Sequence, residues 1–114
     1  MYTLPTLDYD YDALGKYISK DIMQLHHSKH HQTYIDKLNT ALDTQPDLAT
    51  RSLEDLLGHL DTLPAEVQTA IRNHGGGHYN HTLFWKWMSP DGGGEPTGEL
   101  AANLIEKYGS YQQF

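Results

Sequence analysis

The amino-acid sequence predicts an all-α protein built on a long antiparallel helical hairpin. Apolar residues recur at helical spacing in two long stretches, near residues 20–42 and 65–88. Each stretch also carries a histidine cluster, at residues 26–31 and 74–81. Because imidazole is the commonest metal ligand in proteins, two such clusters on facing helices predict a site between them.

The first long helix follows an irregular arm, residues 2–17, which is rich in Tyr, Asp and Pro and ends in a short helical turn. Ser19 is suited to cap the helix, and Asp21 places a negative charge in its first turn. The helix is expected to end at about Leu42, before Pro46. Its predicted inward face comprises Ile22, Leu25, His26, His30, Tyr34, Leu38, Ala41 and Leu42.

A short helix and the second long helix follow. Ser52 and Asp55 have the spacing of a capping box, and the short helix that they begin carries a leucine stripe at Leu53, Leu56, Leu57 and Leu60. The long helix opens at Pro64, a residue favoured in the first turn. Its predicted inward face comprises Val67, Ala70, Ile71, His74, His78, His81, Trp85 and Met88.

Three consecutive glycines, Gly75 to Gly77, interrupt this second long pattern. Each glycine costs a helix roughly 1 kcal/mol relative to alanine. One interpretation is that the helix ends in a turn at Gly75. The other is that the helix continues, and that the missing side chains allow another helix or a polar site to approach closely.

The last part of the chain begins with a helix-breaking segment, Ser89–Pro96. Thr97 is expected to cap a helix that runs to about Tyr108 and is stopped by Gly109. Residues 110–113 have capping-box spacing, which predicts the start of a further helix, but the sequence ends one residue later. We therefore expect a truncated front part of a longer protein, divided into a helical domain at 1–89, a linker at 90–96 and the start of another domain at 97–114.

The composition argues against several classes of function. The net charge is −7 and the eight basic residues form no stripe, which disfavours a nucleic-acid partner. The absence of cysteine excludes a disulfide framework, a thiolate metal site and a cysteine nucleophile. The chain has neither a membrane-length apolar run nor a signal-peptide pattern. It is expected to be soluble, without a membrane partner, and cytoplasmic, or in the mitochondrial matrix had a presequence been removed.

Helical spacing divides the first histidine cluster between two faces. His26, His30 and Tyr34 are four residues apart and share one face, whereas His27 and His31 are rotated by about 100°. His26 and His30 share the apolar stripe and are expected to point inward. Zinc proteases have the same spacing of histidines but need Glu where His27 stands. The alternative for such a pair is histidines satisfied by ordinary hydrogen bonds.

The second cluster ends beside large aromatic side chains. Phe84 and Trp85 follow His81 and would form an apolar wall that keeps water from a metal. The alternative is that these residues, together with Trp87 and Met88, belong to an ordinary core, which is the interpretation we favour for Met88.

Four separated motifs, in order, closely resemble the N-terminal part of the manganese/iron superoxide dismutase family. They are Leu4-Pro5, the run from Leu25 to Tyr34, the run from Gly75 to Trp85, and Gly92–Pro96. The similarity extends from about Tyr2 to Phe114. It implies an α-helical hairpin followed by the first helices of an incomplete C-terminal α/β domain.

The resemblance also implies roles for individual residues. His26 and His81 match metal ligands of the family. His30 and Tyr34 match the pair that lines the substrate funnel, and Tyr34 also matches a member of the hydrogen-bond relay to metal-bound solvent. Both are therefore candidate catalytic residues.

Two further positions, Trp85 and Gly77, match residues that surround the ligands. Trp85 matches a position in the apolar shell. In iron-type members a Gln stands at the position of Gly77, whereas in manganese-type members the Gln comes from the C-terminal domain. The resemblance thus favours manganese as the cofactor and leaves iron open.

The activity implied by the resemblance is the antioxidant disproportionation of superoxide to O₂ and H₂O₂, in a homo-oligomeric oxidoreductase, a homodimer or a tetramer. In the family the two other ligands, an Asp and a His, lie in the C-terminal domain, so this chain alone is expected to be inactive. The alternatives are a non-catalytic helical fragment that binds divalent metals weakly through its histidines, and a product that docks with a missing half.

Overall fold

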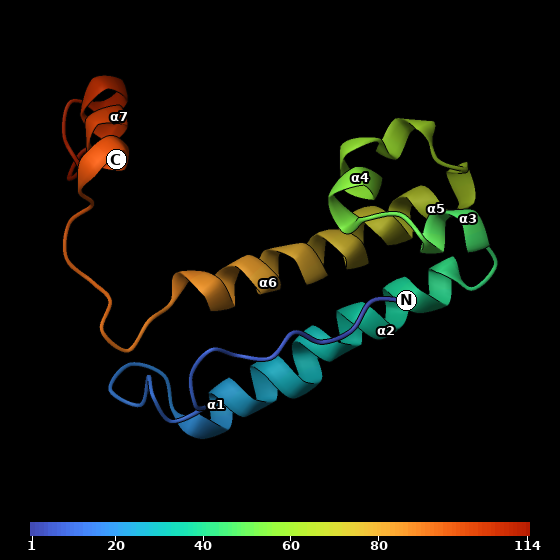
Figure 1. Cartoon of the computed structure of the whole chain (residues 1–114), viewed down its shortest axis with the longest axis horizontal. Helices are drawn as coiled ribbons and strands as arrows, with labels where there is room; N and C mark the ends of the chain where they lie inside the picture. Colours follow the sequence, from blue (N-terminus) through green and yellow to red (C-terminus); the bar gives the residue numbers. More distant parts are fainter.

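Two long helical rods form the body of the molecule. The computed structural model describes residues 1–114, all of them helical, turn or loop, with no strand. The first rod consists of α1 (Lys20–Leu25), η1 (His26–His31) and α2 (Gln32–Leu42), and the second of α5 (Ala65–Ala70), η3 (Ile71–Gly75) and α6 (Gly76–Trp87). The rods run antiparallel, side by side (Figure 1). The predicted all-α hairpin is therefore confirmed, and its two helices lie where the periodicity places them.

Each rod contains a short π-helical stretch, and these stretches carry most of the clustered histidines. In the first rod the stretch is η1, and in the second it is η3, which ends at Gly75. Such wider turns inside α-helices are frequently found at functional sites. The backbone nevertheless stays helical through Gly75, Gly76 and Gly77, so the prediction of a continuous helix is confirmed and that of a turn at Gly75 is wrong.

Three short helices close one end of the hairpin: α3 (Pro46–Ala49), α4 (Leu53–Gly58) and the 3₁₀ turn η2 (Leu60–Thr62). The Ser52 hydroxyl accepts a hydrogen bond from the Asp55 amide at 3.2 Å, as its capping pattern predicts. The helix α3 was not predicted from the sequence. Pro46 was interpreted only as the end of the preceding helix, whereas it also suits the first turn of a new one.

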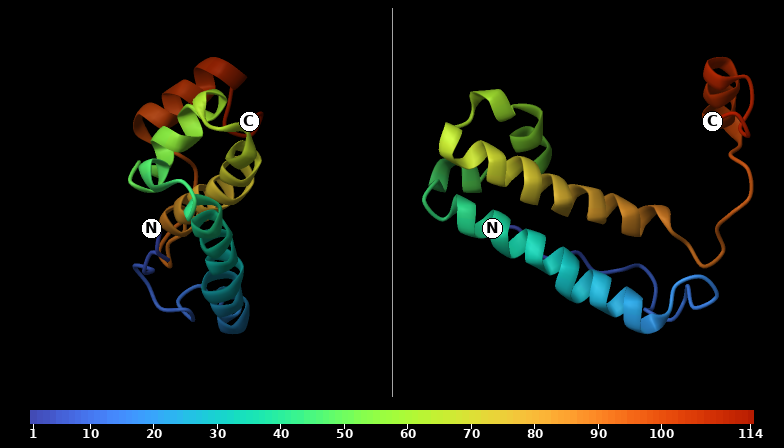
Figure 2. Two further views of the ribbon diagram at one scale, coloured as in Figure 1. Left: turned by 90° about the vertical axis from the view of Figure 1, so that its right-hand side faces the viewer. Right: turned by 180° about the vertical axis from the view of Figure 1, so that it is seen from behind.

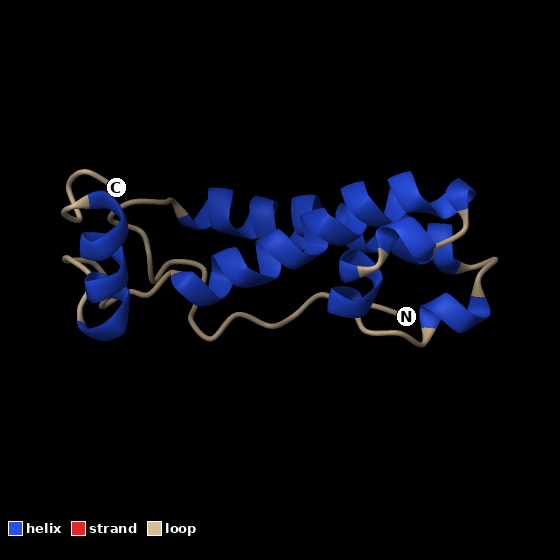
Figure 3. Ribbon diagram, turned by 90° about the horizontal axis from the view of Figure 1, so that it is seen from above, coloured by secondary structure: helices blue, strands red, loops and turns tan.

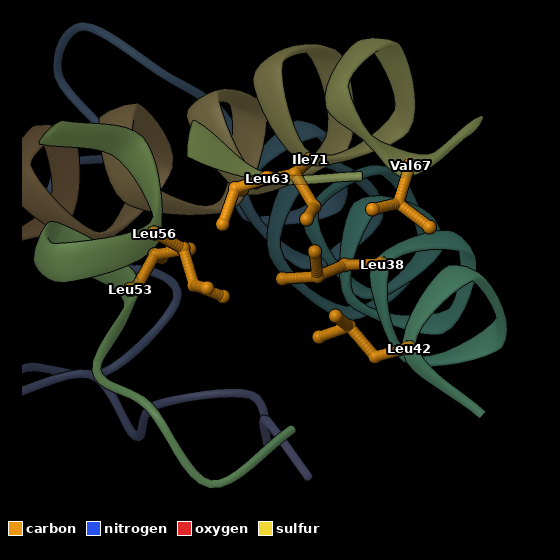
Figure 4. Packing of buried hydrophobic residues seen from close by; sticks show 7 residues of the cluster. All are labelled: Leu38, Leu42, Leu53, Leu56, Leu63, Val67 and Ile71. Atoms are coloured by element: carbon orange, nitrogen blue, oxygen red, sulfur yellow. The ribbon is translucent and has the colours of Figure 1, made fainter. Parts of the chain in front are cut away.

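The main hydrophobic core lies at this closed end. It joins the first rod, the short helices and the second rod, and comprises Leu38, Leu42, Leu53, Leu56, Leu63, Val67 and Ile71 (Figure 4). Each of these side chains is at most 8% exposed. Burying a side chain of this kind contributes about 1.5 to 3 kcal/mol, so this core anchors the hairpin and leaves the opposite end free to form a site.

A smaller core at the other end ties the N-terminal arm to the hairpin. It contains Leu14 from the arm, Met23 from α1 and Trp85 from α6. The arm runs along the hairpin (Figure 1), and the Tyr9 hydroxyl donates to the Trp85 carbonyl at 2.8 Å. The predicted irregular arm with a final helical turn is confirmed.

The helix α7 (Gly98–Tyr108) stands apart from the hairpin beyond an extended connection (Figure 2). It has no buried residue. Gly109 ends it with φ 86°, as predicted, but the Thr97 side chain makes no capping hydrogen bond. The view from above in Figure 3, coloured by secondary structure, shows helices and loops only. No helix combines the length and apolar character needed to cross a membrane.

The predicted inward face of the first rod is wrong in its N-terminal half. Ile22 and Leu25 are each 53% exposed, and His30 is also exposed. The buried residues are instead Met23, His27, His31, Ile35, Leu38 and Leu42. The burial of this other face depends on tertiary packing, because the N-terminal arm covers the face that carries His27. On the second rod Trp87 is 77% exposed and is not core, whereas Met88 packs on the smaller core as expected.

Candidate metal centre

His26 and His81 face each other across the hairpin. His26 lies in η1 and His81 in α6, 55 residues further along the chain. Their Nε2 atoms are 2.9 Å apart. Both side chains are half-buried. The antiparallel rods thus bring together the two residues that the sequence analysis paired.

A main-chain contact fixes the orientation of His81. Its Nδ1 lies 2.7 Å from the carbonyl oxygen of Gly77, one turn earlier in the same helix. Since a carbonyl only accepts, Nδ1–H is the donor and Nε2 carries the lone pair. That lone pair points toward His26. Such a bond from the distal ring nitrogen is the usual way in which a metal-binding histidine is held.

His30 is the third imidazole of the cluster. One ligand atom from each of His26, His30 and His81 lies within 4.8 Å of the others. The His30 ring centroid is 5.3 Å from that of His26 and 5.1 Å from that of His81. Unlike the other two, His30 is exposed. His30 therefore reaches the centre, but its side chain is exposed and not buried as its predicted inward orientation implied.

The donor set fits a metal ion of the first transition row. Two nitrogens bound to one ion at about 2.1 Å and at 90° to 109° are roughly 3.0 to 3.4 Å apart, close to the observed separation of His26 and His81. Burial, followed by the neighbouring His81 and His30, lowers the pKa of His26. The neutral imidazole that results is the form that binds metals.

Tyr34 lies against the cluster because Gly77 has no side chain. The Tyr34 ring centroid is 5.2 Å from those of both His30 and His81. A Cβ atom on Gly77 would lie less than 3.0 Å from three carbons of the Tyr34 ring. At Gly75 an added Cβ would be 3.1 Å from a methyl carbon of Leu53. These two glycines allow the close approach predicted for the glycine run.

Trp85 forms the apolar wall of the centre. Its side chain is 4% exposed, and its ring centroid is 5.0 Å from that of His26. Phe84 lies 5.6 Å from His26, centroid to centroid, and is 37% exposed. The wall predicted from the sequence is present, and Trp85 is its buried part.

A buried series of hydrogen bonds, which was not predicted from the sequence, supports this wall. Trp85 Nε1–H donates to His31 Nδ1 at 3.0 Å. His31 Nε2 therefore carries a proton and donates to His78 Nδ1 at 2.7 Å. The His31 ring also stacks on His81 at an interplanar angle of 27° and a centroid distance of 5.3 Å. His31 thus supports both the wall and the metal-facing imidazole.

His31 and His78, the two histidines of this hydrogen-bond series, are held in the neutral form. His31 is fully buried, and burial, followed by the effect of His78, His81 and His27, lowers its pKa to about 3. Burial also lowers the pKa of His78. The four-residue spacing of the buried Met23, His27, His31 and Ile35 was the sequence signal that could have identified this face.

His27, in contrast, anchors the N-terminal arm. Its Nε2–H donates to the Pro5 carbonyl at 2.8 Å, so Nδ1 accepts from the Tyr11 hydroxyl, also at 2.8 Å. Both ring nitrogens are occupied by protein partners, and His27 is not available to a metal.

The centre opens on two hollows beside His26. One, of about 460 Å³, is lined by Ile22, Leu25, His26, Lys29, His30 and Thr33. The other, of about 330 Å³, is lined by His26, Asn80, His81, Leu83, Phe84 and Trp87. Neither hollow contains a carboxylate, and the three clustered ligand residues of the centre are all histidines.

The imidazoles of two antiparallel helices thus face each other across a hairpin. This arrangement defines the class of the domain: a helical hairpin with a metal site between its helices. Comparison with known proteins gives a more specific result. Residues 1–89 match the family described as iron/manganese superoxide dismutases, alpha-hairpin domain. The chain belongs to this family.

The chain is similar to several curated proteins of the family. It is 50% identical over 113 residues to the superoxide dismutase [Mn] of Listeria monocytogenes, covering 99% of this chain and 56% of that protein. It is 55% identical over 107 residues to superoxide dismutase [Mn] 2 of Bacillus anthracis, covering 94% and 51%. The corresponding values for superoxide dismutase [Mn] 3 of Leptolyngbya boryana are 50% over 111 residues, 97% and 46%. The chain spans about half the length of these relatives.

Proposed function

We propose that this chain provides the helical-hairpin part of a manganese superoxide dismutase, which converts two superoxide anions and two protons to O₂ and H₂O₂. The observation that carries the proposal is the pair of Nε2 atoms of His26 and His81, 2.9 Å apart, with the Nδ1–H of His81 held by the Gly77 carbonyl. The names of the similar proteins support manganese and superoxide.

In this proposal His26 and His81 hold the metal. A bound manganese ion would supply the reversible one-electron chemistry that the disproportionation needs. Gly77 supports manganese over iron, because the family resemblance associates a Gln at this position with iron. The lone pair on Nε2 of His81 and the lowered pKa of His26 keep both imidazoles available for coordination at neutral pH.

The surrounding residues have separate roles. Tyr34 makes no hydrogen bond within the chain, so its hydroxyl is free to hold and pass on a proton. His30, exposed at the entrance, contacts the incoming anion. The Trp85 ring beside His26 excludes water and lowers the local dielectric constant, which strengthens electrostatic interactions at the centre.

The remaining ligands are proposed to come from outside these residues. Manganese prefers oxygen ligands, and the cluster in this chain contains only imidazoles. The family pattern supplies an Asp and a His from a C-terminal domain, and the hollows beside His26 are open to such a domain. We further propose a homo-oligomer, as the resemblance implies.

A second candidate function is weak, non-catalytic binding of divalent metals. The all-imidazole donor set and the exposure of His30 favour it. The two candidates differ in what a supplied C-terminal half would do: a dismutase domain would gain activity from it, whereas a simple metal-binding domain would not.

The test is reconstitution. The chain is mixed with the separately produced C-terminal half of the Bacillus anthracis relative and loaded with Mn²⁺, and loose metal is removed by chelation. Superoxide decay is followed by pulse radiolysis and manganese content by mass spectrometry. We expect activity only in the mixture, and its loss in His26→Ala and His81→Ala but not in the exposed control His59→Gln. A mixture that forms a manganese-loaded complex without activity would refute the dismutase role.

A further inference from the structure

A small polar pocket beside Tyr34 adjoins the metal cluster and shares His30 with it. It encloses about 190 Å³ and is lined by His30, Thr33, Tyr34, Lys37 and His74. Neither His26 nor His81 lines it. The first four residues have the i, i+3, i+4, i+7 spacing of one helix face, and His74 closes the pocket from the opposite rod. Every lining residue carries a polar group, and none is acidic.

The donors in this pocket lack partners. Lys37 is in no ion pair, and neither its ammonium group nor the Tyr34 hydroxyl has a hydrogen-bond partner in the chain. The His74 Nδ1 atom is buried without a partner. A proton on that atom would be a buried, unpaired N–H, so the favourable tautomer carries it on Nε2, the accessible nitrogen. Three free donors, one of them cationic, therefore meet in one small space.

The Thr33 hydroxyl is a further polar group of the pocket. It already donates to the Lys29 carbonyl at 2.7 Å, so it is not a fourth free donor. The ring centroids of Tyr34 and His74 are 6.3 Å apart. Although the net charge of the chain is −7, this pocket has free donors and one fixed positive charge, and no carboxylate lines it.

We propose that this pocket is a binding site for a small inorganic oxyanion of the phosphate class. The Lys37 ammonium supplies the charge, and the Tyr34 hydroxyl and the Nε2–H of His74 donate to the anion's oxygens. Hydrogen bonds to a charged group are stronger than those between neutral groups, and an oxyanion offers enough acceptors for all three donors. The pocket shares His30 with the metal cluster, but the three donors are not part of that cluster, so the proposal does not depend on the dismutase role.

The experiment titrates the full, metal-free chain with inorganic phosphate at constant ionic strength, with sodium chloride as the reference titrant. Nuclear magnetic resonance follows the side-chain signals of Tyr34 and His74. We expect saturable shifts at both residues with phosphate and none with chloride. Lys37→Gln and His74→Phe should each weaken binding about tenfold, and Lys107→Gln, in the separate helix α7, should change it less than about twofold.

Two outcomes would overturn the proposal. One is the absence of saturable shifts at Tyr34 and His74 in the unmodified chain. The other is equal weakening by Lys37→Gln and Lys107→Gln, which would show general attraction to positive charge rather than a site. Because Lys37 is exposed, its replacement leaves the fold intact, and the comparison remains valid even if His74→Phe does not fold.

Discussion

The aromatic ring of Tyr34 rests on the main chain of Gly77, at a distance that leaves no room for a Cβ atom on that glycine. This contact joins the two rods at the metal centre. Tyr34, the candidate proton donor, can take this position because Gly77 on the facing helix has no side chain. Gly77 also supplies the carbonyl that orients His81, so one residue positions two members of the centre.

The first prediction concerns this contact. Gly77→Ala should destabilise the chain by about 1 to 3 kcal/mol, because the new methyl group collides with the Tyr34 ring. Gly76→Ala is the matched control, since nothing lies within 4 Å of a Cβ there. The control should be about 0.5 to 1 kcal/mol more stable than the original chain, because alanine is the better helix former. Urea unfolding followed by circular dichroism measures both; equal effects would contradict the contact.

The second prediction separates ligands from their surroundings. His26→Ala and His81→Ala should each weaken Zn²⁺ binding by at least roughly tenfold, since loss even of an outer partner costs on the order of 10- to 100-fold. Tyr34→Phe removes only a hydroxyl and should leave Zn²⁺ affinity unchanged. Isothermal titration calorimetry gives the three affinities. A large loss of affinity in Tyr34→Phe would show that the phenol is itself a ligand.

Several helix boundaries could be predicted from the sequence because their causes are local. Ser19 and Ser52 cap their helices through bonds to residues three positions ahead, and Gly109 ends α7 with the positive φ that glycine tolerates. The facing of His26 and His81 was also predictable, because each long periodic helix carries a histidine cluster and the family resemblance pairs these two residues.

The distribution of histidines between the faces of the first rod was not predictable in the same way. His27 and His31 have the same spacing as His26 and His30, so periodicity alone does not rank the pairs. The choice depends on tertiary partners: the Pro5 carbonyl for His27 and the Trp85 indole for His31. The wider turns of η1 further shift the register of the helix face.

The third prediction concerns metal selectivity. The centre in this chain contains imidazoles only, and such sites follow the Irving–Williams order, in which Mn²⁺ is the weakest of the common divalent ions. The chain alone should therefore take up Cu²⁺, Ni²⁺ or Zn²⁺ in preference to Mn²⁺ from an equimolar mixture, as measured by mass spectrometry after desalting. His30→Ala should reduce uptake if its imidazole coordinates, and leave uptake unchanged if it only lines the entrance. Preferential retention of Mn²⁺ would contradict the all-imidazole description.

The last prediction is the acid sensitivity of the metal-free chain. The pKa of His31 is about 3 in the folded state and about 6.5 in an unfolded chain, so below pH 6.5 the unfolded state binds a proton that the folded state excludes. The contribution of His31 to stability is complete above pH 6.5 and falls as the pH decreases toward 3, by up to about 1.4 kcal/mol per pH unit. Urea unfolding at pH 7.5, 6.0 and 5.0 measures this slope. His31→Gln removes the titrating group and should flatten the slope, whereas His59→Gln, at an exposed position, should not. Parallel curves for the original chain and His31→Gln would show that burial of His31 does not control the acid response.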